Sequence, residues 1–288
     1  KHGRLEGNII LIFQTSEERT VEERSGAVRV IRFLEQKGIR KDIDAIFGLH
    51  VLTELERGTV KVLEGPQMAS SGDFEVILKS PGGHIMKVHE LPNINEILAR
   101  IIAKINQEYG YQMPVPKPKK ILISSAAVHF VGKAGYNILA QEGGTKWVLR
   151  ILSAEYKTKR GEILEKVKQI VKEETEPWKG KGLSVNFKFN PGYRPLLHRS
   201  PKMVALSQEV AKEIIGEKVK FDKEPMMGGE DFSFYLEEFR GKEIPGTFMM
   251  IGAANPKKGI PLCVHHSPNF SPFKFFNFKI FPLLINFS

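Results

Sequence analysis

The stretch Ile9-Ile10-Leu11-Ile12-Phe13 is followed shortly by two adjacent carboxylates, Glu17 and Glu18. Consecutive apolar residues of this kind predict a buried strand over residues 8–13. Charge directly after a buried strand is costly unless the carboxylates meet a partner, and a divalent metal ion with its water is one such partner. The alternative is that both acids open the next helix, because acidic side chains favour a first helical turn.

Two segments further along the chain extend this pattern. Residues 23–36 have the helical spacing of apolar residues, and residues 43–51 predict a second buried strand that ends on His50. A strand, a helix and a strand of this length predict a βαβ unit with a parallel sheet. Since ligands of open α/β sheets bind beyond the carboxyl ends of the strands, Glu17, Glu18 and His50 are expected near one site.

The composition indicates an ordinary soluble globular protein. The chain has 288 residues, of which 41% are hydrophobic and 26% charged, and this is room for about two domains. No apolar run approaches the roughly 20 residues of a membrane helix, and the N-terminal residues lack a secretory pattern. The single cysteine, Cys263, suits a reducing compartment. We therefore expect a cytoplasmic protein without a membrane partner.

The net charge of +10 raises the question of a nucleic-acid partner. The lysines are spread over expected helices and loops, with no basic stripe that carries interleaved aromatic residues. Solvated helix faces explain most of this charge, so we expect no nucleic-acid function.

A second pattern of elements begins near Asp73. The order β-α-β-β-α-β is that of the ferredoxin-like arrangement. The expected strands and helices, in chain order, are residues 74–78, 92–107, 121–130, 145–153, 159–174 and 183–189. We therefore expect an α/β fold in which residues 1–71 and 191–288 form a parallel-sheet domain and residues 72–190 an inserted ferredoxin-like α+β domain.

Several motifs resemble one known family when they are taken together. Phe13-Gln14-Thr15-Ser16-Glu17-Glu18 is similar to the F-Q-P-A-E-E motif of the zinc aminoacylase/carboxypeptidase metallopeptidases, in the amidohydrolase branch that includes hippurate hydrolase, indole-acetyl-amino-acid hydrolases and archaeal carboxypeptidases. Further stretches follow in the family's order, at residues 47–51, 65–70, 82–84, 228–233 and 265–268. The resemblance covers residues 5 to 270, approximately, and implies a dimerisation or lid role for the inserted domain.

The resemblance implies a metal site. Glu17 would be the general base that deprotonates a metal-bound water, Glu18 and His266 would ligate one divalent ion, and His50 would ligate a second. The cofactor would be zinc, with cobalt or manganese as alternatives. Taken alone, His50 is better explained as a hydrogen-bonded core histidine at a strand end.

The resemblance also implies roles on the inserted domain. His84 and Asn137 would reach an active site to hold the substrate and the tetrahedral oxyanion. Glu230 and Asp231 are expected to cap or brace the helix after Gly229 rather than to ligate metal.

The chain departs from the family pattern at its start. The family's Cys-x-His or Asp-x-His pair, expected well before the two glutamates, has no counterpart in the sequence. We therefore expect an N-terminally truncated chain with weak or absent activity.

The expected function is metal-dependent hydrolysis of the amide of N-acyl amino acids or of C-terminal residues of short peptides. The expected assembly is a homodimer through the inserted domain. The alternative is a non-catalytic truncated homologue that serves as a dimerisation or binding module.

Overall fold

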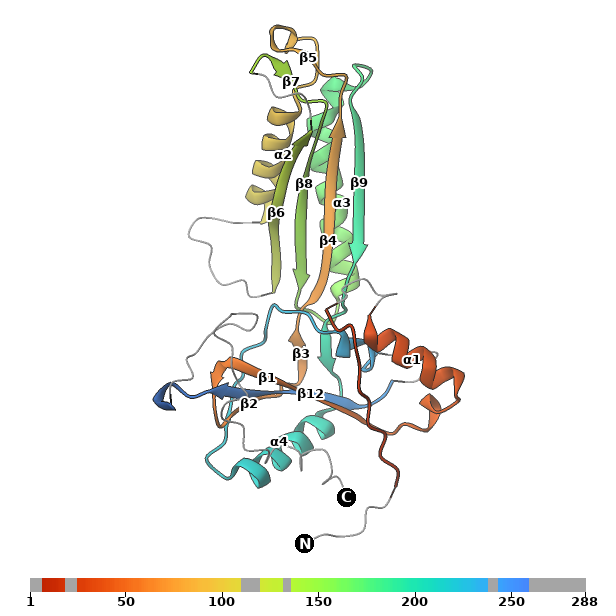
Figure 1. Cartoon of the computed structure of the whole chain (residues 1–288), viewed down its shortest axis with the longest axis vertical. Helices are drawn as coiled ribbons and strands as arrows, with labels where there is room; N and C mark the ends of the chain where they lie inside the picture. Colours follow the sequence, from red (N-terminus) through yellow and green to blue (C-terminus); the bar gives the residue numbers. More distant parts are fainter. Residues whose placement is uncertain (1–6, 19–24, 110–119, 132–135, 238–242, 259–288) are drawn as a thin grey trace.

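The computed structural model describes residues 7–18, 25–109, 120–131, 136–237 and 243–258. Figure 1 shows an elongated molecule with a β-sheet near each end. The first sheet has the strand order β1-β12-β2-β11, and the second has the order β6-β8-β4-β9. In the first sheet the strands are β1 (Ile46–Glu56), β12 (Gly246–Ala254), β2 (Thr59–Lys61) and β11 (Lys220–Phe221).

The first sheet is mixed. Strand β1 runs parallel to β12, with Ile46 opposite Gly246, whereas β2 runs antiparallel to β12, with Lys61 opposite Met250. The expectation of a parallel sheet is therefore correct for the β1–β12 and β11–β2 pairs and wrong for the β12–β2 pair. A tight turn at Gly58, whose φ of 89° suits glycine, reverses the chain after β1 and brings β2 back in the opposite direction.

Both faces of β12 are covered, so all its residues are buried. Phe248 and Met250 belong to the apolar cluster beneath helix α1 (Gly26–Gln36) and the 3₁₀ turn η5 (Asp231–Phe234), and Met249 belongs to the cluster beneath helix α4. Helix α4 (Pro201–Ile215) has its proline in the first turn, as the sequence predicted, because the missing N–H is not needed there.

The predicted strand over residues 8–13 is wrong. The described part of this segment forms no strand, and Ile9, Ile10, Leu11 and Phe13 are 48–90% exposed. A buried strand needs a paired neighbour and a covering layer, and the described residues supply neither. The expected βαβ unit is therefore absent from the described residues, and the parallel partner of β1 comes from the far end of the chain.

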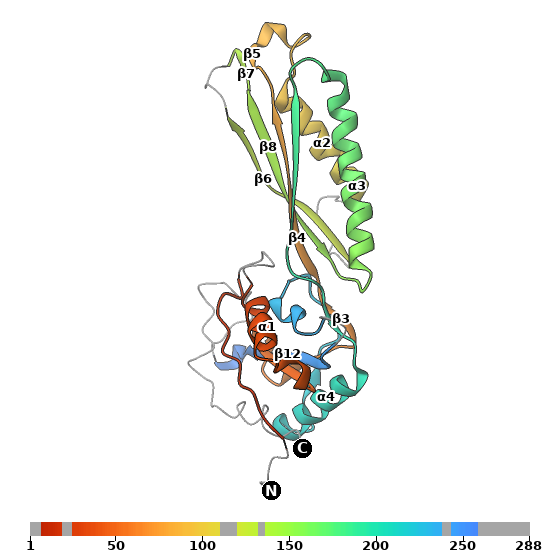
Figure 2. The ribbon, with the colours of Figure 1, turned by 90° about the vertical axis from the view of Figure 1, so that its right-hand side faces the viewer.

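The second sheet is antiparallel throughout. Its elements follow the order β-α-β-β-α-β, and helices α2 and α3 lie on one face of it (Figure 2). They are β4 (Ser70–Lys79), α2 (Ile94–Tyr109), β6 (Ile121–Val131), β8 (Glu142–Ile151), α3 (Tyr156–Thr175) and β9 (Ser184–Pro191). In the core, Trp147 stacks on Phe74 with ring centroids 5.8 Å apart.

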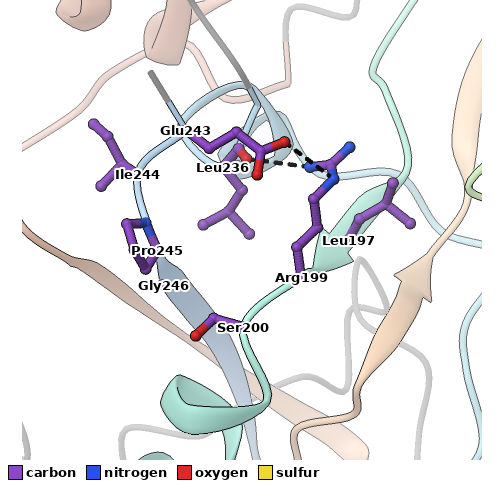
Figure 3. Close-up of a pocket in the computed structure, with 8 residues that line it drawn as sticks. All are labelled: Leu197, Arg199, Ser200, Leu236, Glu243, Ile244, Pro245 and Gly246. Carbon is purple, nitrogen blue, oxygen red and sulfur yellow. Dashed lines mark hydrogen bonds and ion pairs between the residues drawn. The ribbon is translucent and has the colours of Figure 1, made fainter. Parts of the chain in front are cut away.

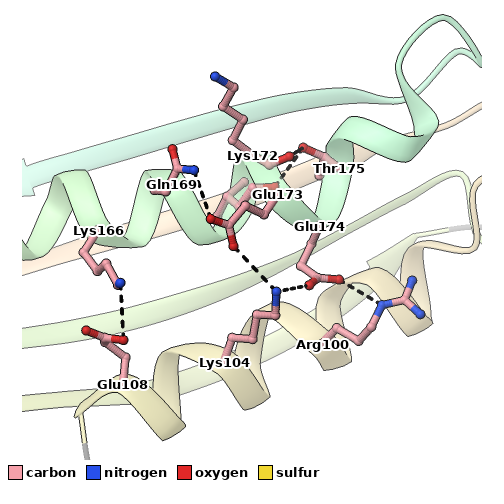
Figure 4. Close-up of polar contacts among 10 residues, drawn as sticks. Arg100, Lys104, Glu108, Lys166, Gln169, Lys172, Glu173, Glu174 and Thr175 are labelled. Atoms are coloured by element: carbon pink, nitrogen blue, oxygen red, sulfur yellow. Dashed lines mark hydrogen bonds and ion pairs between the residues drawn. The ribbon is translucent and has the colours of Figure 1, made fainter.

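Ion pairs join the outer surfaces of α2 and α3 (Figure 4). The Glu174 carboxylate accepts from Arg100 Nε at 3.0 Å and pairs with Lys104 Nζ at 2.7 Å. A further pair lies one to two helical turns from these, where Lys166 Nζ is 3.5 Å from the Glu108 carboxylate. The helices thus bury apolar residues against the sheet, and charged pairs join their outer surfaces.

Short elements complete the fold. Strands β3 (Gly65–Met68) and β10 (Leu196–His198) pair with each other, as do β5 (Gly83–His84) and β7 (Ile138–Leu139). The remaining elements are the 3₁₀ turns η2 (Arg40–Asp42), η3 (Ile85–Lys87), η4 (Glu176–Trp178) and η6 (Pro256–Lys258). Among the described residues, none of the helices has the length and apolar character needed to cross a membrane.

Candidate functional site

Residues 14–18, here called the strap, end in the turn that carries Glu17. Ser16 has a φ of 62° and, among the residues that the structure describes, is the one non-glycine residue in the left-handed region. This conformation costs about 1 kcal/mol or more. Its carbonyl accepts from Gly26 N at 3.2 Å. A side chain at Gly26 would place its Cβ 1.9 Å from the Thr15 carbonyl oxygen, so only glycine lets the strap lie against the start of α1.

Asp231 anchors both the strap and the start of α1. Its carboxylate accepts from Gln14 Nε2 at 2.8 and 2.9 Å, from Ser25 Oγ at 2.8 Å and from Ala27 N at 3.0 Å. The side-chain oxygen Oε1 of Gln14 in turn accepts from Tyr235 OH at 2.7 Å. A buried carboxylate at a helix N-terminus is favoured by the helix dipole and by its N–H donors.

Tyr193 contacts the strap from the other side. It is buried, and its hydroxyl donates to the carbonyl oxygen of Glu17. Burial, followed by the nearby Glu17 carboxylate, raises the pKa of Tyr193, so the hydroxyl remains a donor. No motif in the sequence pointed to this tyrosine.

Three carboxylates gather at this point. Glu17, Glu230 and Asp231 each place an oxygen within 4.8 Å of the others. Burial first, and the Glu17 carboxylate second, raise the pKa of Glu230 to about 8. Hard oxygen ligands in this number suit a divalent cation, whose charge would offset their mutual repulsion.

The expected supporting roles of Glu230 and Asp231 are partly confirmed. The Glu230 side chain caps η5 by accepting from Phe232 N at 3.3 Å. Asp231 braces α1 rather than the segment after Gly229, and its Oδ2 already takes three donors. Both residues nevertheless lie close enough to Glu17 to share a cation, which the sequence did not predict.

The other predicted ligands are placed differently. Within the described ranges, neither Glu18 nor His50 belongs to the carboxylate cluster. Glu18 is exposed, and His50 lies within β1 opposite Met250, because β1 continues to Glu56. The prediction that His50 ends its strand is therefore wrong. His266 lies outside the described residues.

His84 and Asn137 are brought together, but far from Glu17. They sit where β5 and β7 pair, at the end of the second sheet that is remote from the first sheet (Figures 1 and 2). His84 Nδ1 accepts from Met86 N at 3.3 Å. Its Nε2 lies 3.4 Å from the side-chain nitrogen Nδ2 of Asn137.

Two further features near the first sheet are structural. The buried His198 donates from Nδ1 to the Leu63 carbonyl at 2.7 Å and accepts at Nε2 from Phe248 N at 3.0 Å. The pocket of Figure 3 is lined by none of the predicted site residues, and its Arg199 donates to the Leu236 carbonyl and pairs with Glu243.

Comparison with known proteins adds several related hydrolases. An IAA-amino acid hydrolase ILR1-like 4 from Arabidopsis thaliana is 27% identical over 92% of this chain and 56% of its own length. Thermostable carboxypeptidase 1 from Saccharolobus solfataricus is 26% identical over 92% and 61%. N-acetylcysteine deacetylase from Bacillus subtilis is 28% identical over 88% and 60%. The chain thus spans about three fifths of the length of the curated relatives that it matches.

Solved structures share the fold. The Bacillus subtilis YXEP protein, a dinuclear metal binding peptidase, matches with a TM-score of 0.58 and 23% identity over 84% of this chain and 55% of that one. The aminobenzoyl-glutamate utilization protein from Klebsiella pneumoniae matches with a TM-score of 0.59 and 17% identity over 83% and 56%. The model of peptidase family M20/M25/M40 matches residues 1–275. With nearly the whole chain matched, and with the motifs in the family's order, this chain belongs to peptidase family M20/M25/M40.

Proposed function

We propose that the chain provides the catalytic base of a metal-dependent amidohydrolase. The substrates are N-acyl amino acids or short peptides that lose their C-terminal residue. Relatives named as an amino-acid-conjugate hydrolase, a carboxypeptidase and a deacetylase support this class, because each cleaves an amide bond next to an amino acid. Since the chain spans part of their length, its activity as it stands is part of the proposal.

The observation that carries the proposal is the carboxylate cluster around Glu17. A group of buried acids is unfavourable without a compensating charge, and Glu230, 6% exposed beside Glu17, has the raised pKa that such crowding produces. The donor set therefore fits a divalent cation. Glu230 is better suited to contact it than Asp231, whose Oδ2 is occupied by three donors, and this leaves Glu17 beside the cation as the base.

A bound zinc ion, or cobalt or manganese in its place, would polarise the amide carbonyl and make water more acidic. Glu18, His50 and His266 stay proposed ligands by resemblance. Glu17 takes the proton from the attacking water and then passes it to the leaving amine, for which it needs only hydrogen-bond reach of both.

We also propose that the chain works as a homodimer. Strand β6 is an edge strand of the second sheet, and it carries the exposed apolar residues Val128, Phe130 and Val131. An exposed apolar edge is suited to pair with the same edge of a second copy. His84 and Asn137, remote from Glu17 of their own chain, would then serve the site of the partner, with residues 72–190 as the inserted domain. A reducing, cytoplasmic location fits the single cysteine.

The test is an assay of the full chain with zinc, cobalt or manganese on N-acetyl- and N-benzoyl-amino acids. Glu17→Gln keeps the shape of the side chain but removes the base, so kcat should fall by about 10²- to 10⁴-fold. The matched control, Glu64→Gln, changes an exposed glutamate of the same region and should leave turnover unchanged.

Calorimetric metal titration completes the test. Stoichiometric binding that Glu230→Gln or His266→Ala weakens would support the proposal and tell the two ligand sets apart. An absence of both metal binding and turnover, in a chain that still dimerises, would refute it in favour of a non-catalytic dimerisation module.

A further inference from the structure

Tyr193 lies where the chain returns from the second sheet to the first. Three hydrogen bonds join this crossing to the outgoing one at Ser71: Ser71 N to the Tyr193 carbonyl at 2.8 Å, Tyr193 N to Ser71 Oγ at 2.7 Å, and Gly192 N to the Ser71 carbonyl at 3.0 Å. We call Ser71, Gly192 and Tyr193 the clasp. Because both chain crossings meet in it, any rotation of one sheet relative to the other must act through these residues.

The clasp is packed without spare room. A Cβ at Gly192 would lie 2.4 Å from Ser71 Oγ. A Cβ at Gly229 would lie 2.8 Å from Nη1 of Arg150, on the second sheet, and 3.0 Å from the ring of Tyr193. The Tyr193 ring also meets the edge of Phe234, with centroids 6.3 Å apart. Contacts with Ser71 of β4 and with Phe234 of η5 therefore fix the direction in which the tyrosine hydroxyl points.

That hydroxyl reaches the backbone of the proposed general base. Tyr193 OH donates to the Glu17 carbonyl, one residue after the left-handed Ser16. At the other end of the strap, Gln14 is held by Asp231 and Tyr235. The strap is thus fixed to the first sheet's surroundings at Gln14 and to the clasp at Glu17.

We propose that Tyr193 is a positioning residue that ties the location of Glu17 to the clasp between the two sheets. The inference rests on the proposed function of Glu17 as general base. Tyr193 acts through the Glu17 backbone rather than on the substrate. A change in the relative orientation of the sheets would therefore move the base.

The test compares Tyr193→Phe with Tyr109→Phe in the full chain. Each variant removes a tyrosine hydroxyl that donates to a backbone carbonyl, but the Tyr109 bond, to Ile163 at 3.5 Å, lies within the second sheet and its helices. Hydrogen–deuterium exchange of the strap amides is the first measurement, because it needs neither metal nor substrate. Loss of one hydrogen bond should speed strap exchange about two- to tenfold in Tyr193→Phe and leave it unchanged in Tyr109→Phe.

Kinetics with metal are the second measurement. Misplacement of the base should lower kcat by about ten- to a hundredfold in Tyr193→Phe with little change in KM, because substrate contacts are unaltered. If Tyr193→Phe does not fold, Ser71→Ala replaces it, since it removes the acceptor of Tyr193 N and should speed strap exchange as well.

The outcomes separate this inference from the proposed function. A parent chain without metal-dependent turnover contradicts the proposed function, while faster strap exchange in Tyr193→Phe would still support the tie between Tyr193 and Glu17. Strap exchange equal in Tyr193→Phe and Tyr109→Phe, or equal kcat values in an active parent and Tyr193→Phe, would overturn the inference.

Discussion

The two sheets of this chain hold their interiors together in different ways. The second sheet buries an apolar cluster beneath two helices, with Phe74, Trp147 and Ile101 fully buried, and its charged pairs lie on the surface. The region around the first sheet, here called the first region, buries polar groups as well, among them His198 and Asp231. Their hydrogen bonds join segments that lie far apart along the chain. Apolar burial stabilises without selecting one partner, whereas a buried carboxylate or imidazole is tolerated only with its own donors and acceptors.

The largest loss of stability is expected from a substitution of Asp231. Asp231→Ala would leave the buried donors of Gln14, Ser25 and Ala27 without their acceptor, so we expect the free energy of unfolding to fall by about 4 kcal/mol. Urea unfolding followed by circular dichroism measures the change. Loss of the strap and α1 should precede loss of the second sheet, since the latter contains no contact to Asp231.

Asp73→Ala is the control for this change. The Asp73 carboxylate accepts from Asn190 Nδ2 at 2.7 Å, but this pair is exposed on the second sheet, so its loss should cost less than about 1 kcal/mol. Equal destabilisation by the two substitutions would show that the buried polar network of the first region has no special weight.

His198 is expected to make the stability of the region around the first sheet depend on pH. Burial lowers the pKa of His198 to about 4. The ring nitrogen that would take the second proton accepts from the N–H of Phe248. The unfolded chain binds that proton below about pH 6.5, so stability is fully present above this pH and is lost as pH falls towards 4. The loss should total about 3 kcal/mol.

The measurement is the free energy of unfolding of the parent and of His198→Gln between pH 4 and pH 8. His198→Gln should be less stable than the parent at pH 8 but should lack the parent's extra loss in acid. A parent and a variant with parallel pH curves would show that His198 does not titrate between the folded and unfolded states.

The same contrast explains what could be predicted from the sequence. In the second sheet each element was predicted to within a few residues, because the apolar run in β4 and the helical spacing along α3 are local signals that each element carries in its own sequence. In the first sheet the partner of β1 is β12, and no local pattern announces a pairing between Ile46 and Gly246. The apolar run at residues 9–13 looked like a strand, but strand formation depends on neighbours that the described residues do not provide.

The candidate site shows the same division. The motif around Glu17 and the stretch around Glu230 and Asp231 were found in the sequence, and the structure brings their carboxylates together. The contribution of Tyr193 could not be predicted, since a hydroxyl that bonds to a backbone carbonyl leaves no motif. The positions of Glu18 and His50 depend on where a turn and a strand end, and strand length is decided by pairing with β12 rather than by the strand's own residues.

The smallest effect is expected where the second sheet does use charge, between α2 and α3. Glu174→Gln removes the carboxylate shared by Arg100 and Lys104, both about half exposed, so salt and side-chain entropy limit the loss to less than about 1 kcal/mol. Because exposed charges are screened, the difference from the parent should shrink further in about 1 M salt. Thermal unfolding at low and high salt measures it, with Glu165→Gln, which removes a pair within α3 alone, as the matched control. A loss as large as that of Asp231→Ala, or one that salt leaves unchanged, would contradict this expectation. The two helices would then depend on their ion pairs as strongly as the first region depends on its buried polar groups, and the two sheets would not differ in this respect.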